Sequence, residues 1–173
     1  MDVNFKQKIK ELKYEGVSRV KIAFCDIDGV HRGKYLSLEK FSSVLQSGAG
    51  FCDCVLGWDI NDQLYDNAKF TGWHTAFPDA KYKIDLSTER RLQDENNIPF
   101  YIAHFVKERD ELHDICPRSL LMKVLDKSRR MNIGVNLAFE YEFFIFDETS
   151  HSIRAKNYQN LKHLTPGNFG YSL

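Results

Sequence analysis

One stretch constrains the fold of this chain more than any other: residues 135–147, with the sequence VNLAFEYEFFIFD. Side chains alternate across a β-strand, so one face would carry only apolar side chains, namely Val135, Leu137, Phe139, Tyr141, Phe143 and Ile145. The opposite face would carry two carboxylates, Glu140 and Glu142. The stretch therefore predicts a strand with a strongly apolar face and a pair of acidic residues on the other.

The two glutamates allow two interpretations. At a rise of about 3.3 Å per residue, their Cα atoms would lie roughly 6 to 7 Å apart. This separation suits one divalent ion on each carboxylate, or a shared site, and a metal ion compensates a carboxylate that is flanked by aromatic surface. Alternatively, the polar face is exposed to water and Glu140 and Glu142 are simply solvated. The pattern alone leaves both interpretations open.

Composition limits the classes of partner. The 173 residues include 24 Lys and Arg against 24 Asp and Glu, a formal net charge of zero, which argues against nucleic acid or an anionic membrane as the main partner. No apolar run reaches the roughly 18 residues of a membrane span, and the N-terminus lacks the apolar core of a signal peptide. We therefore expect a cytoplasmic protein.

The cysteines do not follow a metal-binding or redox spacing. They are Cys25, Cys52, Cys54 and Cys116, and no two form a C-x-x-C pair. Cys52 and Cys54 lie in a short apolar stretch, residues 51–56, which predicts a strand. We expect these two thiols to be small core residues on one side of it.

The first half of the chain predicts a small α+β domain. Residues 2–15 have the apolar spacing of an amphipathic helix, and residues 17–27 alternate as a strand. Asp28-Gly29 is a strong hairpin signal, so residues 30–36 should form the partner strand. A helix capped by Ser37 should follow.

Further along, residues 57–80 predict a long irregular loop, and residues 82–86 and 99–106 predict strands joined by a polar connection. A hairpin, a helix and further strands in this order suggest a β-grasp domain over residues 1–110. Residues 111–173 would then begin a second domain.

The second domain should open with a helix over residues 114–130. Pro117 suits its first turn, and basic residues fill its last turn. Its buried stripe is predicted to consist of Leu120, Leu121, Val124 and Leu125. With one helix and one strand this domain cannot bury both faces of a sheet, so we expect it to be incomplete.

Several motifs in this order resemble the glutamine synthetase family, in its N-terminal portion. They are Phe24-Cys25-Asp26-Ile27-Asp28-Gly29, Arg32-Gly33-Lys34, Trp58-Asp59, Pro78-Asp79, Pro117-Arg118-Ser119 and Glu140-x-Glu142-Phe143-Phe144. The resemblance implies an α+β chain: a β-grasp domain followed by the beginning of a catalytic domain with a funnel-like active site.

The resemblance also implies a reaction and its residues. An ATP-dependent ligase of this family joins glutamate to ammonia or another amine through a γ-glutamyl phosphate, with Mg²⁺ or Mn²⁺ bound by Glu140 and Glu142. Asp59 matches the aspartate that binds ammonium and helps to remove its proton. Family members form homo-oligomeric rings in which this aspartate serves the neighbouring subunit's active site. From pattern alone, Asp59 could instead be a turn residue that caps its own loop.

This chain departs from the family pattern in two respects. The family's Phe-Asp-Gly-Ser-Ser is replaced by Trp58-Asp59-Ile60-Asn61-Asp62, which makes an amine other than ammonia plausible. The later glutamates, the metal-binding histidine and the ATP-binding arginines of the family have no counterpart before Leu173. A non-catalytic, structural or subunit-interaction protein is therefore the competing hypothesis.

Overall fold

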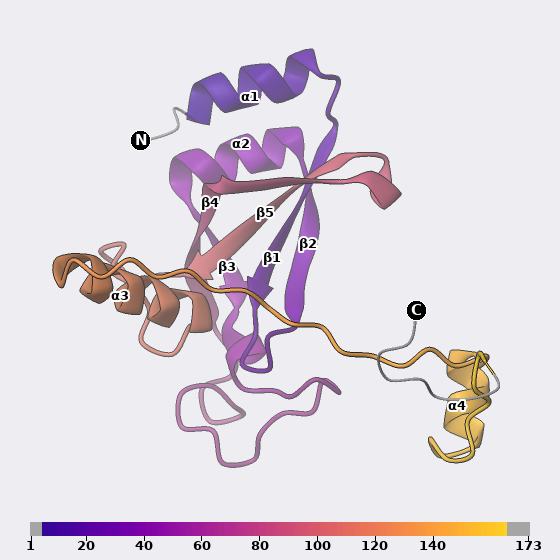
Figure 1. Cartoon of the computed structure of the whole chain (residues 1–173). Helices are drawn as coiled ribbons and strands as arrows, with labels where there is room; N and C mark the ends of the chain where they lie inside the picture. The colour runs from indigo at the N-terminus through magenta and orange to yellow at the C-terminus, as the bar shows by residue number, and fades with distance from the viewer. Residues whose placement is uncertain (1–4, 166–173) are drawn as a thin grey trace. The chain divides into compact units, whose positions relative to one another are not determined.

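The computed structural model describes residues 5–165 (Figure 1). The chain divides into two compact units, Met1–Gly134 and Val135–Leu173. Among residues 5–165, the first unit has a five-stranded sheet, three α-helices and two short 3₁₀ helices, and the second has one short α-helix.

The sheet has the strand order β2-β1-β5-β4-β3. Its members are β1 (Arg19–Cys25), β2 (His31–Ser37), β3 (Ala49–Cys52), β4 (Asp79–Leu92) and β5 (Ile98–Phe105). β1 and β5 are parallel, and every other neighbouring pair is antiparallel. The sheet is therefore mixed, and with its helices it makes a mixed α/β unit.

The hairpin of β1 and β2 is confirmed. Arg19 pairs with Ser37 and Cys25 with His31, and Gly29 in the turn has a φ of +81°. This left-handed conformation suits glycine, which has no Cβ to clash. The apolar residues of β1 at alternate positions, Val20, Ile22 and Phe24, are all buried.

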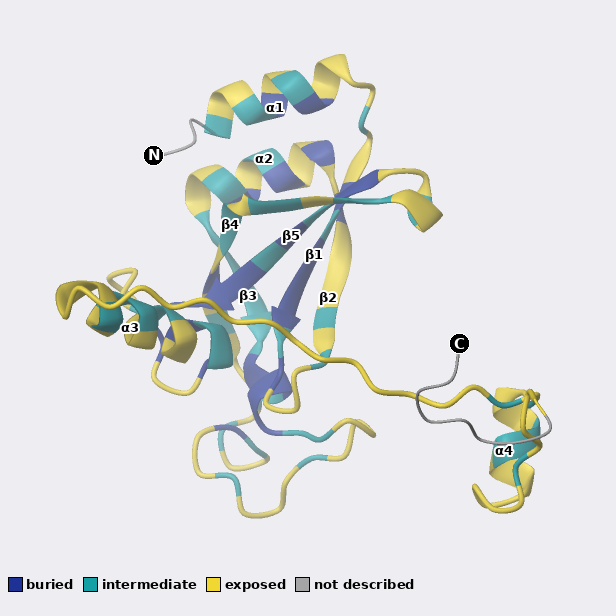
Figure 2. Ribbon diagram, in the orientation of Figure 1, coloured by how far each residue is buried: buried dark blue, intermediate teal, exposed yellow. Residues whose placement is uncertain are grey.

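α2 packs against β1 and β2, and α1 packs against α2 (Figure 1). α1 (Phe5–Tyr14) buries Ile9 and Leu12, as its apolar spacing predicts. α2 (Leu38–Ser47) begins at Ser37, whose hydroxyl accepts the Lys40 N–H at 3.1 Å. The core between these helices and the central strands includes Phe24, Phe41, Tyr82, Tyr101 and Phe105. Figure 2 shows long buried stretches of β1 and β5.

Two elements of this unit differ from the sequence expectation. Only Ala49–Cys52 forms a strand, because the chain then turns into a short 3₁₀ helix, η1 (Asp53–Leu56). Cys54 therefore lies on this helix rather than on a strand, and both Cys52 and Cys54 are half-buried. β4 is longer than predicted, because it continues through the charge-rich segment after an irregularity between Asp85 and Arg90.

The prediction of a buried apolar stripe on α3 (Pro117–Arg130) is wrong, although the helix itself is present. Its buried residue is Ser119, whose hydroxyl donates to the Phe105 carbonyl oxygen at 3.0 Å. Leu120, Leu121 and Val124 are exposed. The helix contacts β5, and Leu125, the fourth residue of the predicted stripe, is half-buried.

The predicted strand over residues 135–147 is also wrong. Residues 135–145 have no regular secondary structure and are exposed, and the pairing in this segment is a single bridge of Phe146 with His163. A strand is defined by ladder hydrogen bonds to a neighbour, and the described residues supply no neighbour for this stretch. The unit's helix, α4 (Ser150–Ala155), was not predicted. Thr149 and Ser152 form a capping box at its start.

No helix within residues 5–165 is both long enough and apolar enough to cross a membrane.

Candidate functional site

The buried carboxylate of Asp26 organises the turn between β1 and β2. Asp26 has 0% of its surface exposed, and its Oδ1 accepts the backbone N–H groups of Asp28 at 3.0 Å and Val30 at 2.8 Å. Its Oδ2 accepts the Nε–H of Arg32 at 2.7 Å. A buried charge needs such a full set of partners, so the turn and the first residues of β2 are fixed to one carboxylate.

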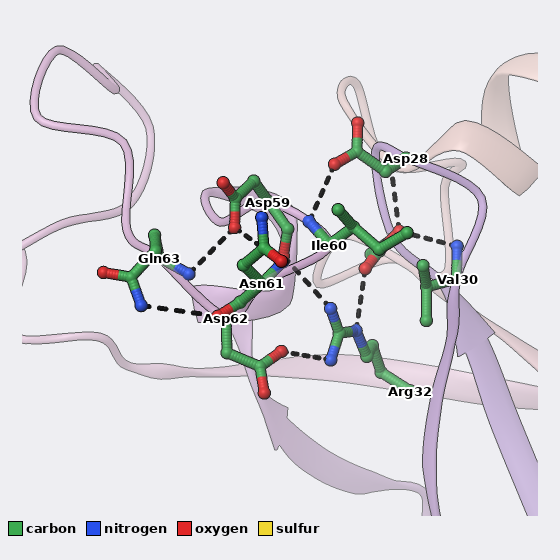
Figure 3. Close-up of polar contacts among 9 residues, drawn as sticks. Asp28, Val30, Arg32, Asp59, Ile60, Asn61, Asp62 and Gln63 are labelled. Carbon is green, nitrogen blue, oxygen red and sulfur yellow. Dashed lines mark hydrogen bonds and ion pairs between the residues drawn. The ribbon is translucent and has the colours of Figure 1, made fainter. Parts of the chain in front are cut away.

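Arg32 connects this turn to the loop that follows η1 (Figure 3). One terminal nitrogen donates to the Asp59 carbonyl oxygen at 3.1 Å, and the other pairs with the Asp62 carboxylate. The guanidinium carbon also lies 4.9 Å from the centroid of the Trp58 ring, which is a cation–π contact. The Arg32 side chain thus contacts both the hairpin turn and the loop that carries Asp59, which are far apart in the sequence.

Asp59 closes a tight turn with its own carboxylate. Its Oδ1 accepts the backbone N–H of Asn61 at 2.8 Å and that of Gln63 at 3.0 Å (Figure 3). The Asp59 N–H donates to the Gln63 carbonyl oxygen at 2.9 Å. Oδ1 of Asp59 therefore caps its own turn, as one of the two interpretations predicts. Oδ2 accepts no hydrogen bond from any described residue.

A second contact holds the same loop to the hairpin. The Ile60 N–H donates to Oδ2 of Asp28 at 2.9 Å. Partial burial and the nearby carboxylates of Asp28 and Asp59 raise the pKa of the Tyr65 hydroxyl. Four aspartates and one arginine meet here, so the region is acidic overall and suits a cationic ligand better than an anionic one.

The far end of the loop has its own anchor. The hydroxyl of Thr71 donates to Oδ1 of the buried Asp53 at 2.6 Å. The ring of Phe70 meets His113 edge to face, with 5.0 Å between centroids. The long loop predicted over residues 57–80 is thus attached to the rest of the unit at both ends.

Glu140 and Glu142 lie in the irregular segment of the second unit, and both are exposed. Carboxylate oxygens are the ligand type that Mg²⁺ and Mn²⁺ prefer, so their chemistry fits a divalent ion. However, residues 5–165 contain no group of three or more His, Cys, Asp or Glu side chains arranged to hold a metal ion. Two glutamates alone do not complete such a site.

Comparison with known sequences supports the resemblance drawn from the motifs. A sequence model described as "Glutamine synthetase, catalytic domain" matches residues 114–170. The chain is 42% identical over 165 residues to type-1 glutamine synthetase 2 of Dictyostelium discoideum, which covers 95% of this chain and 32% of that protein. The resemblance to the glutamine synthetase family is confirmed.

Another relative is named for an organic amine. The chain is 27% identical over 163 residues to glutamate–isopropylamine ligase of Pseudomonas sp, across 94% of this chain and 36% of that protein. The chain thus spans about a third of the length of the curated relatives it matches.

Solved structures of glutamine synthetases share the fold. The cryo-EM structure of Plasmodium falciparum glutamine synthetase aligns with a TM-score of 0.55 at 17% identity, covering 75% of this chain and 23% of that chain. A complex of GmaS with ADP aligns with a TM-score of 0.52 at 18% identity, covering 71% of this chain and 25% of that chain. At this level of identity the likeness concerns the fold alone.

The sequence motifs point to Asp59 but not to the residues that hold it. Asp26 and Arg32 lie within the motifs, but the motifs indicate no role for either residue. One signal was available: Asp26 follows the alternating strand at a position that must turn into the hairpin, where a short acidic side chain readily accepts backbone N–H groups. The contact between Arg32 and the Asp59 loop has no local signal, because the two are 27 residues apart.

Proposed function

We propose that this chain is part of an ATP-dependent ligase that joins glutamate to ammonia or another amine through a γ-glutamyl phosphate. The observation that carries the proposal is the Asp59 turn. Its carboxylate has one oxygen engaged by the Asn61 and Gln63 amides and one oxygen without a partner among the described residues. The relatives' names, glutamine synthetase and glutamate–isopropylamine ligase, support the same reaction class.

The chemistry explains why a fixed carboxylate is useful. An ammonium ion or alkylammonium ion cannot attack a carbonyl until it loses a proton, because its nitrogen has no free electron pair. A carboxylate that binds the cation and accepts its proton supplies the neutral nucleophile beside the acyl phosphate. Since Oδ1 of Asp59 is already occupied by backbone amides, Oδ2 is the atom that we assign to the amine.

Other parts of the proposal follow from the family. We infer a β-grasp domain over residues 1–110 and the beginning of a catalytic domain over residues 111–173. Glu140 and Glu142 would be ligands for Mg²⁺ or Mn²⁺, completed by residues that the described chain does not bring to them. Asp59 would serve a neighbouring subunit's active site in a homo-oligomeric ring. The cytoplasmic location expected from the sequence stays a prediction.

One observation favours a second candidate function, a non-catalytic subunit-interaction protein. Leu120, Leu121 and Val124 form an exposed apolar stripe on α3. Exposed apolar surface of this kind is typical of protein–protein contacts. Such a protein would bind glutamine synthetase-like subunits without forming product.

The two candidates are separated by an activity test on the native assembly isolated through this chain. Glutamate and ATP would be supplied with ammonium, ethylamine, isopropylamine or ethanolamine, and γ-glutamyl amides would be measured by mass spectrometry. The ligase proposal expects an amide that requires both ATP and one of these amines. Absence of every amide, from an assembly that still contains the chain, would favour the non-catalytic function.

A further inference from the structure

Arg32 links the β1–β2 hairpin to the loop that carries Asp59. We propose that Arg32 is a positioning residue that sets the orientation of the Asp59 carboxylate. The inference rests on the proposed function of Asp59 and adds a residue to that site. Arg32 contacts Asp26 in the hairpin and Asp59 in the loop.

On one side, Arg32 is anchored by a buried partner. Its Nε lies 2.7 Å from Oδ2 of Asp26, a carboxylate with no exposed surface. The other oxygen of Asp26 is held by two backbone N–H groups of the turn. The hairpin therefore fixes the plane of the guanidinium group before any contact with the loop is considered.

On the other side, the remaining nitrogens hold the loop at the base of the Asp59 turn. The Asp59 carbonyl oxygen accepts both from Arg32 at 3.1 Å and from the Asp62 N–H at 3.0 Å. The guanidinium also pairs with the Asp62 carboxylate and lies over the Trp58 ring. Residues 58, 59 and 62 are thus held by one side chain, and Figure 3 shows its contacts with Asp59 and Asp62.

Geometry and charge both make this arginine difficult to replace. A planar fork can donate in two directions at once, whereas the single ammonium of lysine cannot reach Asp26 and the Asp59 carbonyl oxygen together. Asp26, Asp28, Asp59 and Asp62 would also repel one another without the central cation. Loss of Arg32 should therefore release the Asp59 turn while leaving the hairpin ladder in place.

The test is amide hydrogen exchange, measured by NMR on the chain without substrates, for Arg32→Lys and Arg32→Ala. The matched control is Arg91→Ala, because Arg91 also pairs with two carboxylates, those of Glu15 and Glu89, but does not contact the loop. We expect the Asn61 and Gln63 amides to exchange about tenfold faster in both Arg32 variants, while the Asp28 and Val30 amides keep their rates. Unchanged exchange at Asn61 and Gln63 would overturn the proposal. Equal acceleration at all four amides would also overturn it, because Arg32 would then be needed only for the hairpin.

A second readout connects the positioning to the amine. In the assembled enzyme, Arg32→Lys should raise the KM for the amine about tenfold and leave the KM for ATP within about twofold, since a small misplacement of a binding group is costly. Equal changes in both constants would contradict a role at the amine subsite. The exchange experiment needs no catalysis, so it tests the role of Arg32 independently of the proposed function. The proposed function would fail if Asp59→Asn left kcat/KM for the amine unchanged.

Discussion

Asp26 and Arg32 form a partly buried ion pair, with 2.7 Å between Oδ2 and Nε and with 0% and 16% of the two side chains exposed. The pair lies where the β1–β2 hairpin meets the loop that carries Asp59. Asp26 holds the backbone of the hairpin turn, and Arg32 carries the contact on to the candidate amine site.

The first prediction concerns Asp26→Asn. The amide oxygen can still accept the backbone N–H groups, but the amide nitrogen would then face the Nε–H of Arg32, donor against donor. We expect the free energy of unfolding to fall by about 3 kcal/mol, the scale for breaking a buried pair. Urea unfolding measures this change. Asp62→Asn removes an exposed partner of the same arginine and should cost less than about 1 kcal/mol. Equal costs for the two variants would contradict the account.

Gly33 provides a second prediction. A Cβ at this position would lie 1.9 Å from the Ile22 carbonyl oxygen, in the middle of the β1–β2 ladder. Backbone must move to relieve such a contact, so Gly33→Ala should destabilise the protein by at least about 2 kcal/mol. Gly134→Ala is the matched control, since a Cβ there meets no atom within 4 Å, and it should change stability by less than about 0.5 kcal/mol. A Gly33→Ala protein as stable as the control would show that the ladder is not packed as described.

The third prediction is a pH dependence between pH 7 and 5. Burial lowers the pKa of His104, assisted by the cation of Arg118 and Lys83 and opposed by Asp85. Burial likewise lowers the pKa of His113, with Asp114 and Asp53 opposing and Lys107 and Lys123 assisting. A histidine whose folded pKa is depressed binds its proton preferentially in the unfolded state, so stability falls as the pH drops below about 6.5.

Urea unfolding at several pH values checks this dependence. The carboxylates with lowered pKa values, such as Asp85 beside Ser87 and Arg118, titrate below this window and do not contribute to the slope. The variant His104→Leu should show a shallower decline than the parent protein. A free energy of unfolding that is constant or rises from pH 7 to pH 5 would rule out the assignment of buried, neutral histidines.

The fourth prediction concerns the exposed stripe of α3. Leu120→Gln together with Leu121→Gln should leave the free energy of unfolding within about 0.5 kcal/mol, because both side chains are exposed in this chain. Ser119→Ala, by contrast, leaves the Phe105 carbonyl oxygen without its hydroxyl donor and should cost about 1 kcal/mol. If the leucine double variant unfolds more readily than Ser119→Ala, the stripe is covered in the folded protein.

Sequence patterns predicted the elements whose signals are local. The spacing of Ile9 and Leu12 marked α1, the Asp28-Gly29 turn marked the hairpin, and Ser37 marked the start of α2. The predictions were wrong where the outcome depends on distant partners. Residues 135–147 have strand-like alternation but no neighbouring strand among the described residues. Leu120 and Leu121 lie on a helical stripe of α3 but are exposed.

The sequence predicted the local part of the candidate site but not its long-range part. The family motif points to Asp59, and the turn-capping alternative for Asp59 could be predicted because Asn61 and Gln63 lie only two and four residues away. The bridge made by Arg32 joins segments that only the folded sheet brings together, so periodicity and spacing could not reveal it. The metal-ligand roles of Glu140 and Glu142 remain predictions.

The central claim, that the Asp59 carboxylate serves the amine, is tested most directly by the steady-state kinetics of Asp59→Asn in the assembled enzyme. Asparagine keeps an oxygen for the Asn61 and Gln63 amides, so the substitution removes the charge and the proton acceptor but preserves the turn. We predict that kcat/KM for the amine falls by about a hundredfold, as expected for loss of a general base, while the KM values for ATP and glutamate change by less than about twofold. Amine kinetics equal to those of the parent enzyme would contradict the account.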